Sequence, residues 1–408
     1  MTSFDIETVR SKFPSLGEDQ VFLDNAGGSQ TLGTVIEAIR DYLSRTNVQL
    51  GASYKTGKLS TERYNSSFAA AAQYVNAEES EIVFGASTTQ LFRNVSFTLN
   101  FSEGDEIIVS SIDHEANIAP WVDLASRQKL VLKWWTPSLS SSDPNPSPQL
   151  LPSELSSLLT ARTRLVTCTH ASNILGSITP ISAITAAVRA GPSPDALVAV
   201  DGVSYAPHRP LDVRALDVDV YGFSWYKVYG PHIAMLYASP RAMRQMKSLG
   251  HFFKQGDILE EKIGLAGASY ELTHGIPSVI SYLRPSPPSS AWGAFIAHEH
   301  ALQTTLLAYL ASRPDVTVYG DTTGASEARV STVSFRVAGW RSQDVVEAVE
   351  AETNFGFRWG AFYSERLVKD LLGLGDDGVV RVSMVHYNTV DEVKGLIEAF
   401  KKYVPKKA

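Results

Sequence analysis

Two side chains in the middle of the sequence suit imine formation and proton transfer. Lys227 follows the β-rich run 218–223 and has aromatic residues on both sides. Partial loss of solvation lowers the pKa of a lysine and makes Schiff-base formation with an aldehyde feasible. Asp201 ends the apolar run 197–200, where it can accept a hydrogen bond from a protonated ring nitrogen. Taken alone, the lysine also suits a surface position and the aspartate a turn.

Two further groups with chemical potential precede this pair in the chain. Ser87, Thr88 and Thr89 lie between a predicted strand and a predicted helix, where hydroxyls and helix-start amides can hold a phosphate. His114 follows another strand, and its ring can stack on a flat ligand or move a proton. In isolation, a helix cap and a structural histidine would look the same. Together, the four groups supply the functions that pyridoxal phosphate (PLP) requires.

The elements that must position these groups alternate between short β-rich runs and longer helical patterns. Such alternation predicts βαβ units and an α/β fold with a mainly parallel central sheet. In sheets of this kind, ligands bind at the carboxyl ends of the strands. We expect strands over 82–84, 106–109, 130–135, 165–169, 197–200 and 218–223.

Two segments rich in serine and proline, 136–153 and 285–290, interrupt this pattern. We interpret the first as a surface loop and the second as a domain boundary. The predicted organisation is a lead-in over residues 1–20 that packs with the small domain, a large PLP-binding domain over 21–285, and a small α+β domain over 286–408. In the small domain we expect helices over 292–312 and 343–351 and strands over 316–319, 328–337 and 379–385.

Two matches to known motifs lack the context that their chemistry needs. The run 373–378 has the spacing of a dinucleotide loop but precedes a β-like run, so we predict a plain loop. His298 and His300 are two residues apart, whereas metal ligands on one helix face are four apart. We therefore predict no metal site.

Composition excludes several other classes of protein. The 408 residues include 36 Lys+Arg and 43 Asp+Glu, and the net charge of −7 offers no general attraction to nucleic acid or anionic lipid. The single cysteine, Cys168, excludes an internal disulfide and a cysteine-based zinc site. We find no signal-peptide pattern and no apolar run of membrane-spanning length. We therefore expect a cytoplasmic enzyme without nucleic-acid or membrane partners.

The order and spacing of the motifs resemble those of the class V aminotransferase or cysteine-desulfurase-like family of fold-type I PLP enzymes. The resemblance covers residues 23 to 390, and it implies a fold-type I transferase with a large domain and a smaller α+β domain. The motifs that carry it are LDNA at 23–26, STT at 87–89, HEANIAPW at 114–121, ASNILG at 171–176, VDG at 200–202, YKVYGP at 226–231, RVS at 381–383 and YNT at 387–389.

This resemblance implies a role for each matching residue. It assigns Lys227 to the internal aldimine, Asp201 to the pyridine nitrogen and His114 to stacking on the ring. It also implies a homodimer in which Thr273 or His274 serves the partner's site. The implied cofactor-binding set is Ser87, Thr88, Thr89, His114, Asn173, Asp201, Ser204, Ser224, Tyr226, Lys227 and Thr273. The implied substrate-binding set is Arg381 for the α-carboxylate, Arg358 as a second anionic contact, Asn25 and Tyr363.

Departures from the family pattern bear on the reaction. A desulfurase needs a mobile cysteine to accept sulfur, and in this family it follows an Arg-x-Gly stretch. Here Tyr363 stands in that place, and Cys168 lies inside an apolar strand. Ser204 and Tyr226 also replace proton-shuttling residues of many relatives. We therefore disfavour a cysteine desulfurase.

The remaining machinery predicts an enzyme that acts at Cα of an amino acid through an external aldimine and a quinonoid carbanion. The cysteine-free arrangement resembles that of the loline-pathway Mannich cyclase, which implies carbon–carbon bond-forming cyclisation in alkaloid-type metabolism. A C–S lyase that works by β-elimination ranks nearly equal, and an inactive partner subunit is a further alternative. An aromatic cluster would suit a cationic iminium, although packing explains it as well. Its members are Trp225, Tyr226, Tyr229, Trp359, Phe362 and Tyr363.

Overall fold

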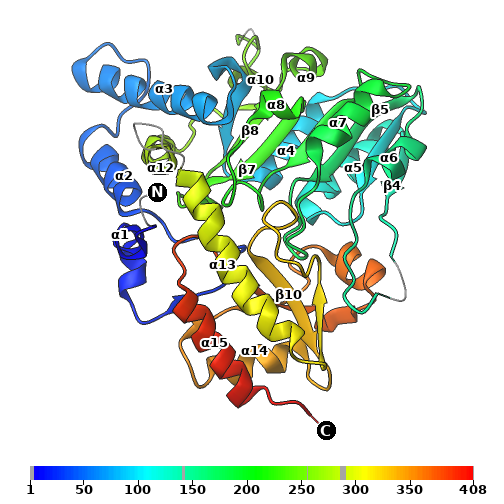
Figure 1. Cartoon of the computed structure of the whole chain (residues 1–408). Helices are drawn as coiled ribbons and strands as arrows, with labels where there is room; N and C mark the ends of the chain where they lie inside the picture. Colours follow the sequence, from blue (N-terminus) through cyan, green and yellow to red (C-terminus); the bar gives the residue numbers. More distant parts are fainter. Residues whose placement is uncertain (1–3, 140–142, 255, 285–290, 408) are drawn as a thin grey trace.

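The computed structural model describes residues 4–139, 143–254, 256–284 and 291–407. The larger part of the molecule is built around a seven-stranded sheet (Figure 1). Its strands lie in the order β2-β8-β7-β6-β5-β3-β4. β8 is antiparallel to both of its neighbours, and the other pairs are parallel. The predicted α/β fold with a mainly parallel sheet is confirmed. The strands are β2 (Ile82–Gly85), β3 (Glu106–Ser110), β4 (Val131–Trp135), β5 (Thr163–Thr169), β6 (Leu197–Asp201), β7 (Val220–Ser224) and β8 (Ala234–Ala238).

Apolar side chains on both faces explain why this sheet is central. All five residues of β6 are buried, and its four apolar residues alternate between two core clusters. Leu197 and Ala199 face one cluster with residues of α4 and α5, whereas Val198 and Val200 face the other with residues of α3 and α7. Helices therefore cover both faces of the sheet. Their bounds are α3 (Lys55–Val75), α4 (Thr88–Thr98), α5 (Ala119–Gln128) and α7 (Ile181–Ala190).

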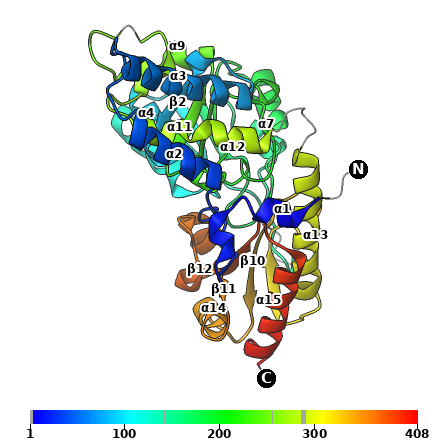
Figure 2. The ribbon, with the colours of Figure 1, turned by 90° about the vertical axis from the view of Figure 1, so that its left-hand side faces the viewer.

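A second sheet lies in the C-terminal part of the chain (Figure 2). Its four strands are antiparallel, in the order β12-β13-β10-β9. The expected strand over 328–337 begins only at Thr332, because Val330 N–H instead bonds to Gly176 O in the segment that follows β5. The strands are β9 (Val316–Tyr319), β10 (Thr332–Val337), β12 (Arg358–Gly360) and β13 (Val379–Ser383), with helices α13 (Ala291–Ala311), α14 (Ser342–Glu350) and α15 (Val390–Tyr403).

The N-terminal segment runs alongside this second sheet. β1 (Val21–Phe22) pairs in parallel with β11 (Phe355–Gly356), and Arg10 of α1 (Ile6–Arg10) forms an ion pair of 2.8 Å with Glu392 of α15. The proposed boundary over 285–290 lies outside the described residues, so the domain limits stay a prediction. The other helices are α2 (Gly33–Arg45), α6 (Pro152–Leu158), α8 (Val213–Leu216), α9 (Pro240–Gln245), α10 (Leu259–Ile263), α11 (Tyr270–His274) and α12 (Ile276–Leu283).

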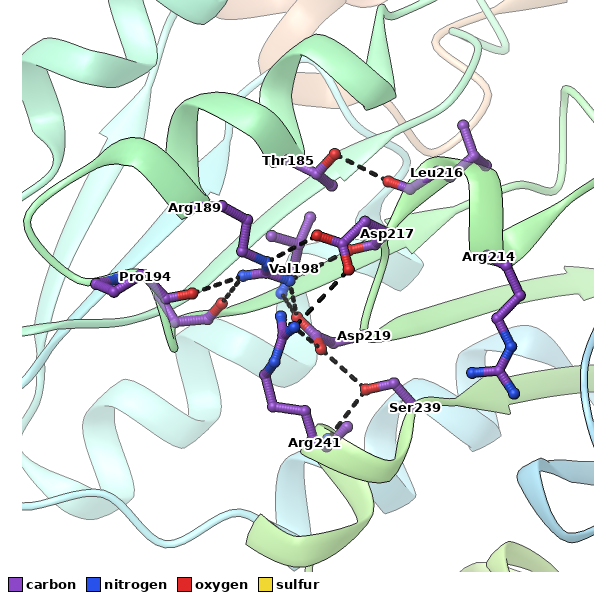
Figure 3. Close-up of polar contacts among 12 residues, drawn as sticks. Thr185, Arg189, Pro194, Val198, Arg214, Leu216, Asp217, Asp219, Ser239 and Arg241 are labelled. Atoms are coloured by element: carbon purple, nitrogen blue, oxygen red, sulfur yellow. Dashed lines mark hydrogen bonds and ion pairs between the residues drawn. The ribbon is translucent and has the colours of Figure 1, made fainter.

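A polar network closes the sheet at the end where β6 and β7 begin (Figure 3). The buried Asp219 accepts hydrogen bonds from Arg189 (2.7 Å), from Val198 N–H (2.9 Å) and from the Ser239 hydroxyl (2.9 Å). Asp217 just before it has a left-handed backbone (φ +50°). This turn explains why β7 begins at Val220 and not at residue 218 as expected.

The two discounted motifs have structural roles. The loop 373–378 contains one 3-10 turn, Gly375–Asp377, and leads into β13 as expected. His298 Nε2 lies 2.7 Å from Asn388 O. Within the described residues, no helix combines the length and apolarity needed to cross a membrane, and the same residues hold no cluster of His, Cys, Asp and Glu suited to a metal ion.

Candidate active site

A pocket opens at the carboxyl ends of the strands of the large sheet. The turns that follow β2, β3, β5, β6 and β7 all contribute to it. The structure brings together here every residue of the expected cofactor-binding set except Thr273. The pocket is lined by Ser87, Thr88, Thr89, His114, Ala116, Thr169, Asn173, Asp201, Val203, Ser204, Ser224, Tyr226 and Lys227.

Lys227 lies at the end of a single 3-10 turn, Trp225–Lys227, which directly follows β7. Its side chain is buried, and its Nζ is 5.9 Å from the centre of the Tyr226 ring. Burial and, to a smaller extent, the charge of Arg381 lower the pKa of Lys227 to about 8, against the opposing effects of Asp201 and Asp24. An amine with this pKa is partly neutral near pH 7 to 8, so it can act as a nucleophile or a base.

Asp201 is the last residue of β6 and is buried. Its Oδ1 accepts a hydrogen bond of 2.8 Å from Val203 N–H. Burial raises the pKa of Asp201 to about 6, although the Val203 amide and the charge of Lys227 oppose the shift. The turn beneath it requires glycine, since a Cβ on Gly202 would lie 2.2 Å from the Tyr221 ring. Asp201 is therefore fixed in place as an acceptor for a protonated nitrogen.

His114 follows β3 and presents a neutral ring. Its Nδ1 accepts a hydrogen bond of 3.0 Å from Ala116 N–H, which leaves the proton of the neutral ring on Nε2. Burial lowers the pKa of His114 to about 4, with contributions from the charges of Lys227 and Arg381. A flat uncharged imidazole of fixed orientation suits stacking on an aromatic ligand.

The hydroxyl groups surround the start of α4. Ser87 caps this helix and accepts from Gln90 N–H at 3.1 Å, and the hydroxyls of Thr88 and Ser224 lie 2.7 Å apart. Ser224 and the residues at the start of this 11-residue helix, Ser87, Thr88 and Thr89, line the same pocket. This is a donor set for a phosphate group.

Arg381 of β13, in the second sheet, is not one of the lining residues but contacts one of them, Asn173. It is buried, and it donates to Asp24 Oδ1 at 2.7 Å and to Asn173 O at 3.2 Å. The Phe362 ring covers the guanidinium at 3.6 Å. Among the described residues, the Nε of Arg381 is buried without a hydrogen-bond partner. A buried, incompletely paired guanidinium suits a planar carboxylate ligand.

The segment after β12 closes over the pocket. Asn173 Nδ2 donates to Phe362 O at 3.0 Å, and Glu115 N–H donates to Tyr363 O at 2.7 Å. Phe362 and Tyr363 both have left-handed backbones, with φ of +49° and +59°. The Tyr363 ring is 74% exposed and lies 5.4 Å from the His114 ring, so it stands at the mouth of the pocket.

Some expected site residues lie elsewhere. The Asn25 amide is buried and donates to Phe22 O and Ser383 O, so it joins the N-terminal segment to β13 and does not line the pocket. Thr273 is fully buried and donates to Ser269 O within its own helix.

The predicted aromatic cluster does not form one group. Trp225 and Tyr229 pack in the core of the large sheet, Tyr226 lines the pocket, and Phe362 and Tyr363 lie beside it in the segment after β12. The sequence analysis also missed Asp24 and Phe362 as neighbours of Arg381. The LDNA motif, which includes Asp24, marked this segment as similar to the family. No local sequence pattern, however, indicates that Asp24 contacts a residue 357 positions away.

Comparison with known proteins identifies the class of this fold and site. The chain matches the class V aminotransferase family over residues 21–396. It is 55% identical to the aminotransferase-like protein FGM3 of Gibberella zeae, over 98% of both chains. It is 39% identical to the nonribosomal peptide synthetase-like enzyme fsqF of Aspergillus fumigatus, over 95% of this chain and 26% of that one. The structure of the cysteine desulfurase CsdA from Escherichia coli is similar with a TM-score of 0.83 and 25% identity, over 99% of both chains.

The chain therefore belongs to the class V aminotransferase family of fold-type I PLP-dependent enzymes. This membership implies PLP as the cofactor, and the pocket fits it. It offers an amine for the aldehyde, a buried acid for the ring nitrogen, a neutral ring for stacking and hydroxyls for the phosphate, in Lys227, Asp201, His114 and the Ser87–Thr89 turn.

Proposed function

We propose that this protein is a PLP-dependent enzyme that acts at Cα of an amino acid and forms a carbon–carbon bond there, in a Mannich-type cyclisation. The observation that carries the proposal is a complete set of PLP-binding side chains without a thiol beside it. Cys168 lies within β5 with no exposed surface, and burial holds the pKa of its thiol well above the usual range. Tyr363 stands at the mouth, where a desulfurase would have its reactive cysteine.

Each buried group at the pocket has a task in this chemistry. When bound, PLP would supply an electron sink for the pair of electrons left by a bond broken at Cα. Asp201 would hold the proton on the ring nitrogen, and His114 would keep the ring flat against its own. Arg381 would bind the α-carboxylate and orient Cα. The amine of Lys227, with its lowered pKa, would carry the proton to or from Cα.

A C–S lyase is the second candidate, because β-elimination uses the same proton transfer by Lys227 and needs no thiol on the enzyme. The absence of a thiol among the lining residues disfavours a desulfurase. An inactive partner subunit is the weakest alternative, since Lys227, Asp201 and His114 line the same pocket.

We further propose that the enzyme is a homodimer that serves specialised metabolism in the cytoplasm. Similarity to fsqF, whose name describes a synthetase-like enzyme of peptide assembly, supports the metabolic setting. Three apolar side chains in one short segment, Leu249, Phe252 and Phe253, are 44%, 99% and 67% exposed in the single chain. Burial of such a patch against a second copy would stabilise the dimer. Analytical ultracentrifugation would test it.

A substrate screen tests the proposed reaction. The purified, PLP-loaded protein is incubated with single amino acids and with amino acid–aldehyde pairs, and the products are analysed by mass spectrometry. We expect a visible absorbance change with the substrate and a product whose mass shows a new carbon–carbon bond. Release of sulfide and a 2-oxo acid from cysteine would favour the lyase. No absorbance change with any amino acid would contradict both.

A further inference from the structure

We propose that His386 is a positioning residue of the active site. Through the Tyr229 hydroxyl it fixes the turn that carries Lys227 against the turn that follows β6 and its last residue, Asp201. The proposal rests on the function proposed above, because it concerns the tasks given there to the amine and the acid. His386 lies just after β13 and is fully buried.

Both ring nitrogens of His386 lie within hydrogen-bond distance of a tyrosine hydroxyl. Nδ1 is 3.0 Å from the Tyr229 hydroxyl, and Nε2 is 2.6 Å from the hydroxyl of Tyr282 in α12. The Phe295 ring of α13 stacks on the imidazole, with the ring centres 3.9 Å apart and an angle of 20° between the planes. The imidazole is therefore held from three sides in one orientation.

The positions of the protons in this network follow from its acceptors. The Tyr229 hydroxyl also lies 2.6 Å from Pro207 O, and a carbonyl oxygen only accepts, so the single hydroxyl proton points to Pro207. Nδ1 of His386 must then donate to the Tyr229 oxygen. Burial lowers the pKa of His386 well below its usual range, so the ring is neutral and its Nε2 accepts from Tyr282. The donors thus run in one direction, from α12 through the imidazole to Pro207 O.

This network joins the turns that carry the two central groups of the site. Tyr229 follows Lys227 by two residues, and Pro207 follows Asp201 by six. The segment 202–206 folds into a tight turn, with two of its amides bonded to its first carbonyl at 2.9 and 3.0 Å. A displacement of the Tyr229 side chain would therefore be passed to the backbone on both sides of the pocket.

The backbone of Tyr229 depends on such support. Its φ is +61°, in the left-handed region that a residue with a side chain seldom adopts. Its N–H donates to Ser29 Oγ at 2.8 Å, and its C=O accepts from Leu32 N–H at 3.0 Å. The hydroxyl bonds described above hold the far end of the side chain. Because a strained conformation persists only where its surroundings over-determine it, loss of these bonds should let the Lys227 turn relax.

Removal of one tyrosine hydroxyl at a time tests this proposal. Tyr229→Phe breaks the link to the Lys227 turn, whereas the matched control Tyr282→Phe removes a hydroxyl from the same imidazole and leaves that link intact. Both should lower the melting temperature, because each removes a hydrogen bond made by His386. Only Tyr229→Phe should weaken PLP binding to the PLP-free protein, by about fivefold, and lower kcat by about tenfold with KM for the amino acid unchanged. Absorbance titration with PLP and steady-state kinetics measure these effects.

Two substitutions test the imidazole itself. The amide nitrogen of asparagine lies as many bonds from Cα as Nδ1 of histidine, so His386→Asn keeps a donor for Tyr229 and should retain PLP affinity within about twofold. His386→Phe keeps only a stacked ring and should match Tyr229→Phe.

Equal PLP affinities in Tyr229→Phe and Tyr282→Phe would overturn the inference, as would a His386→Phe protein that binds PLP like the unchanged one. Absence of turnover with every amino acid would instead count against the proposed function, and the comparison of PLP affinities would still decide whether His386 positions the Lys227 turn.

Discussion

A buried aspartate lies at each end of the large sheet, and the two carboxylates differ in the number of hydrogen bonds that they accept. At the end shown in Figure 3, Asp219 accepts hydrogen bonds from Arg189, Val198 N–H and Ser239. At the carboxyl end of β6, Asp201 is buried to a similar degree, but its carboxylate accepts only from Val203 N–H among the described residues. A buried carboxylate with a full set of partners holds the fold together, whereas one with capacity left over is available to a ligand.

The same contrast separates the basic residues at the two ends. Arg189 donates to two carboxylates and also to the carbonyls of Pro194 and Ala196. Lys227 is buried as well, but no comparable set of partners among the described residues compensates its charge. Burial therefore lowers its pKa. The unsatisfied groups gather at the end of the strands where a ligand can reach them.

The largest expected effect comes from removing the amine at the carboxyl end. Lys227→Ala should lower turnover by about a thousandfold or more, because both the covalent hold on PLP and the proton carrier at Cα are lost. Absorbance of the bound cofactor and product formation measure the two losses. Lys129→Ala, at an exposed position 75% accessible, is the control and should behave as the unchanged enzyme. Retained turnover in the Lys227 variant would refute its assignment.

The matched pair Asp201→Asn and Asp219→Asn tests the contrast directly. Asp201→Asn should reduce turnover by about a hundredfold, and above pH 6 it should raise rather than lower stability, since it removes a poorly paired buried charge. Asp219→Asn should lower the free energy of unfolding by about 3 kcal/mol, because Arg189 keeps a buried charge without its main partner. Turnover per folded molecule should be unchanged in the second variant. Denaturant titration and steady-state kinetics measure both, and the comparison fails if the two variants behave alike.

The pH dependence of stability in the PLP-free protein should differ in sign between two residues of the pocket. The pKa of Asp201 is raised from 3.8 to about 6, so the folded state binds more protons than the unfolded state in this range. Its contribution to stability is therefore lost as the pH rises from 3.8 to 6. The pKa of His114 is lowered from 6.5 to about 4, so its contribution increases as the pH rises from 4 to 6.5.

Unfolding of the Asp201→Asn and His114→Asn variants at several pH values between 4 and 6.5 separates the two contributions. Relative to each variant, the unchanged protein should lose stability with rising pH for the aspartate and gain it for the histidine. Parallel curves for both variants would show that neither group titrates differently in the folded state.

The smallest effect is expected at the single cysteine. Cys168→Ala should leave turnover unchanged and lower the free energy of unfolding by about 1 kcal/mol, as expected for a small buried side chain in β5. Kinetics and denaturant unfolding test both statements. A large loss of activity would revive a role for sulfur in the reaction.

The sequence by itself determined the parts of the site that are local. Asp201, Lys227, His114 and the Ser87–Thr89 turn each follow a short apolar run, and parallel strands bring their carboxyl ends to one edge. Periodicity and residue type therefore predicted which segments form these strands and which chemically active residues follow each of them. The sequence also predicted a site without a reactive thiol, because Cys168 is the single cysteine of the chain.

Only the tertiary structure decided which residues surround Arg381. Asp24, Phe362 and Arg358 reach it through the pairing of β12 with β13 and through the N-terminal segment, contacts between residues that are up to 357 positions apart. The structure also placed Asn25 and Thr273 in internal hydrogen bonds and Trp225 and Tyr229 in the core. Such outcomes depend on the packing of distant segments, and no local pattern encodes which of two buried polar groups will find partners and which will be left for a ligand.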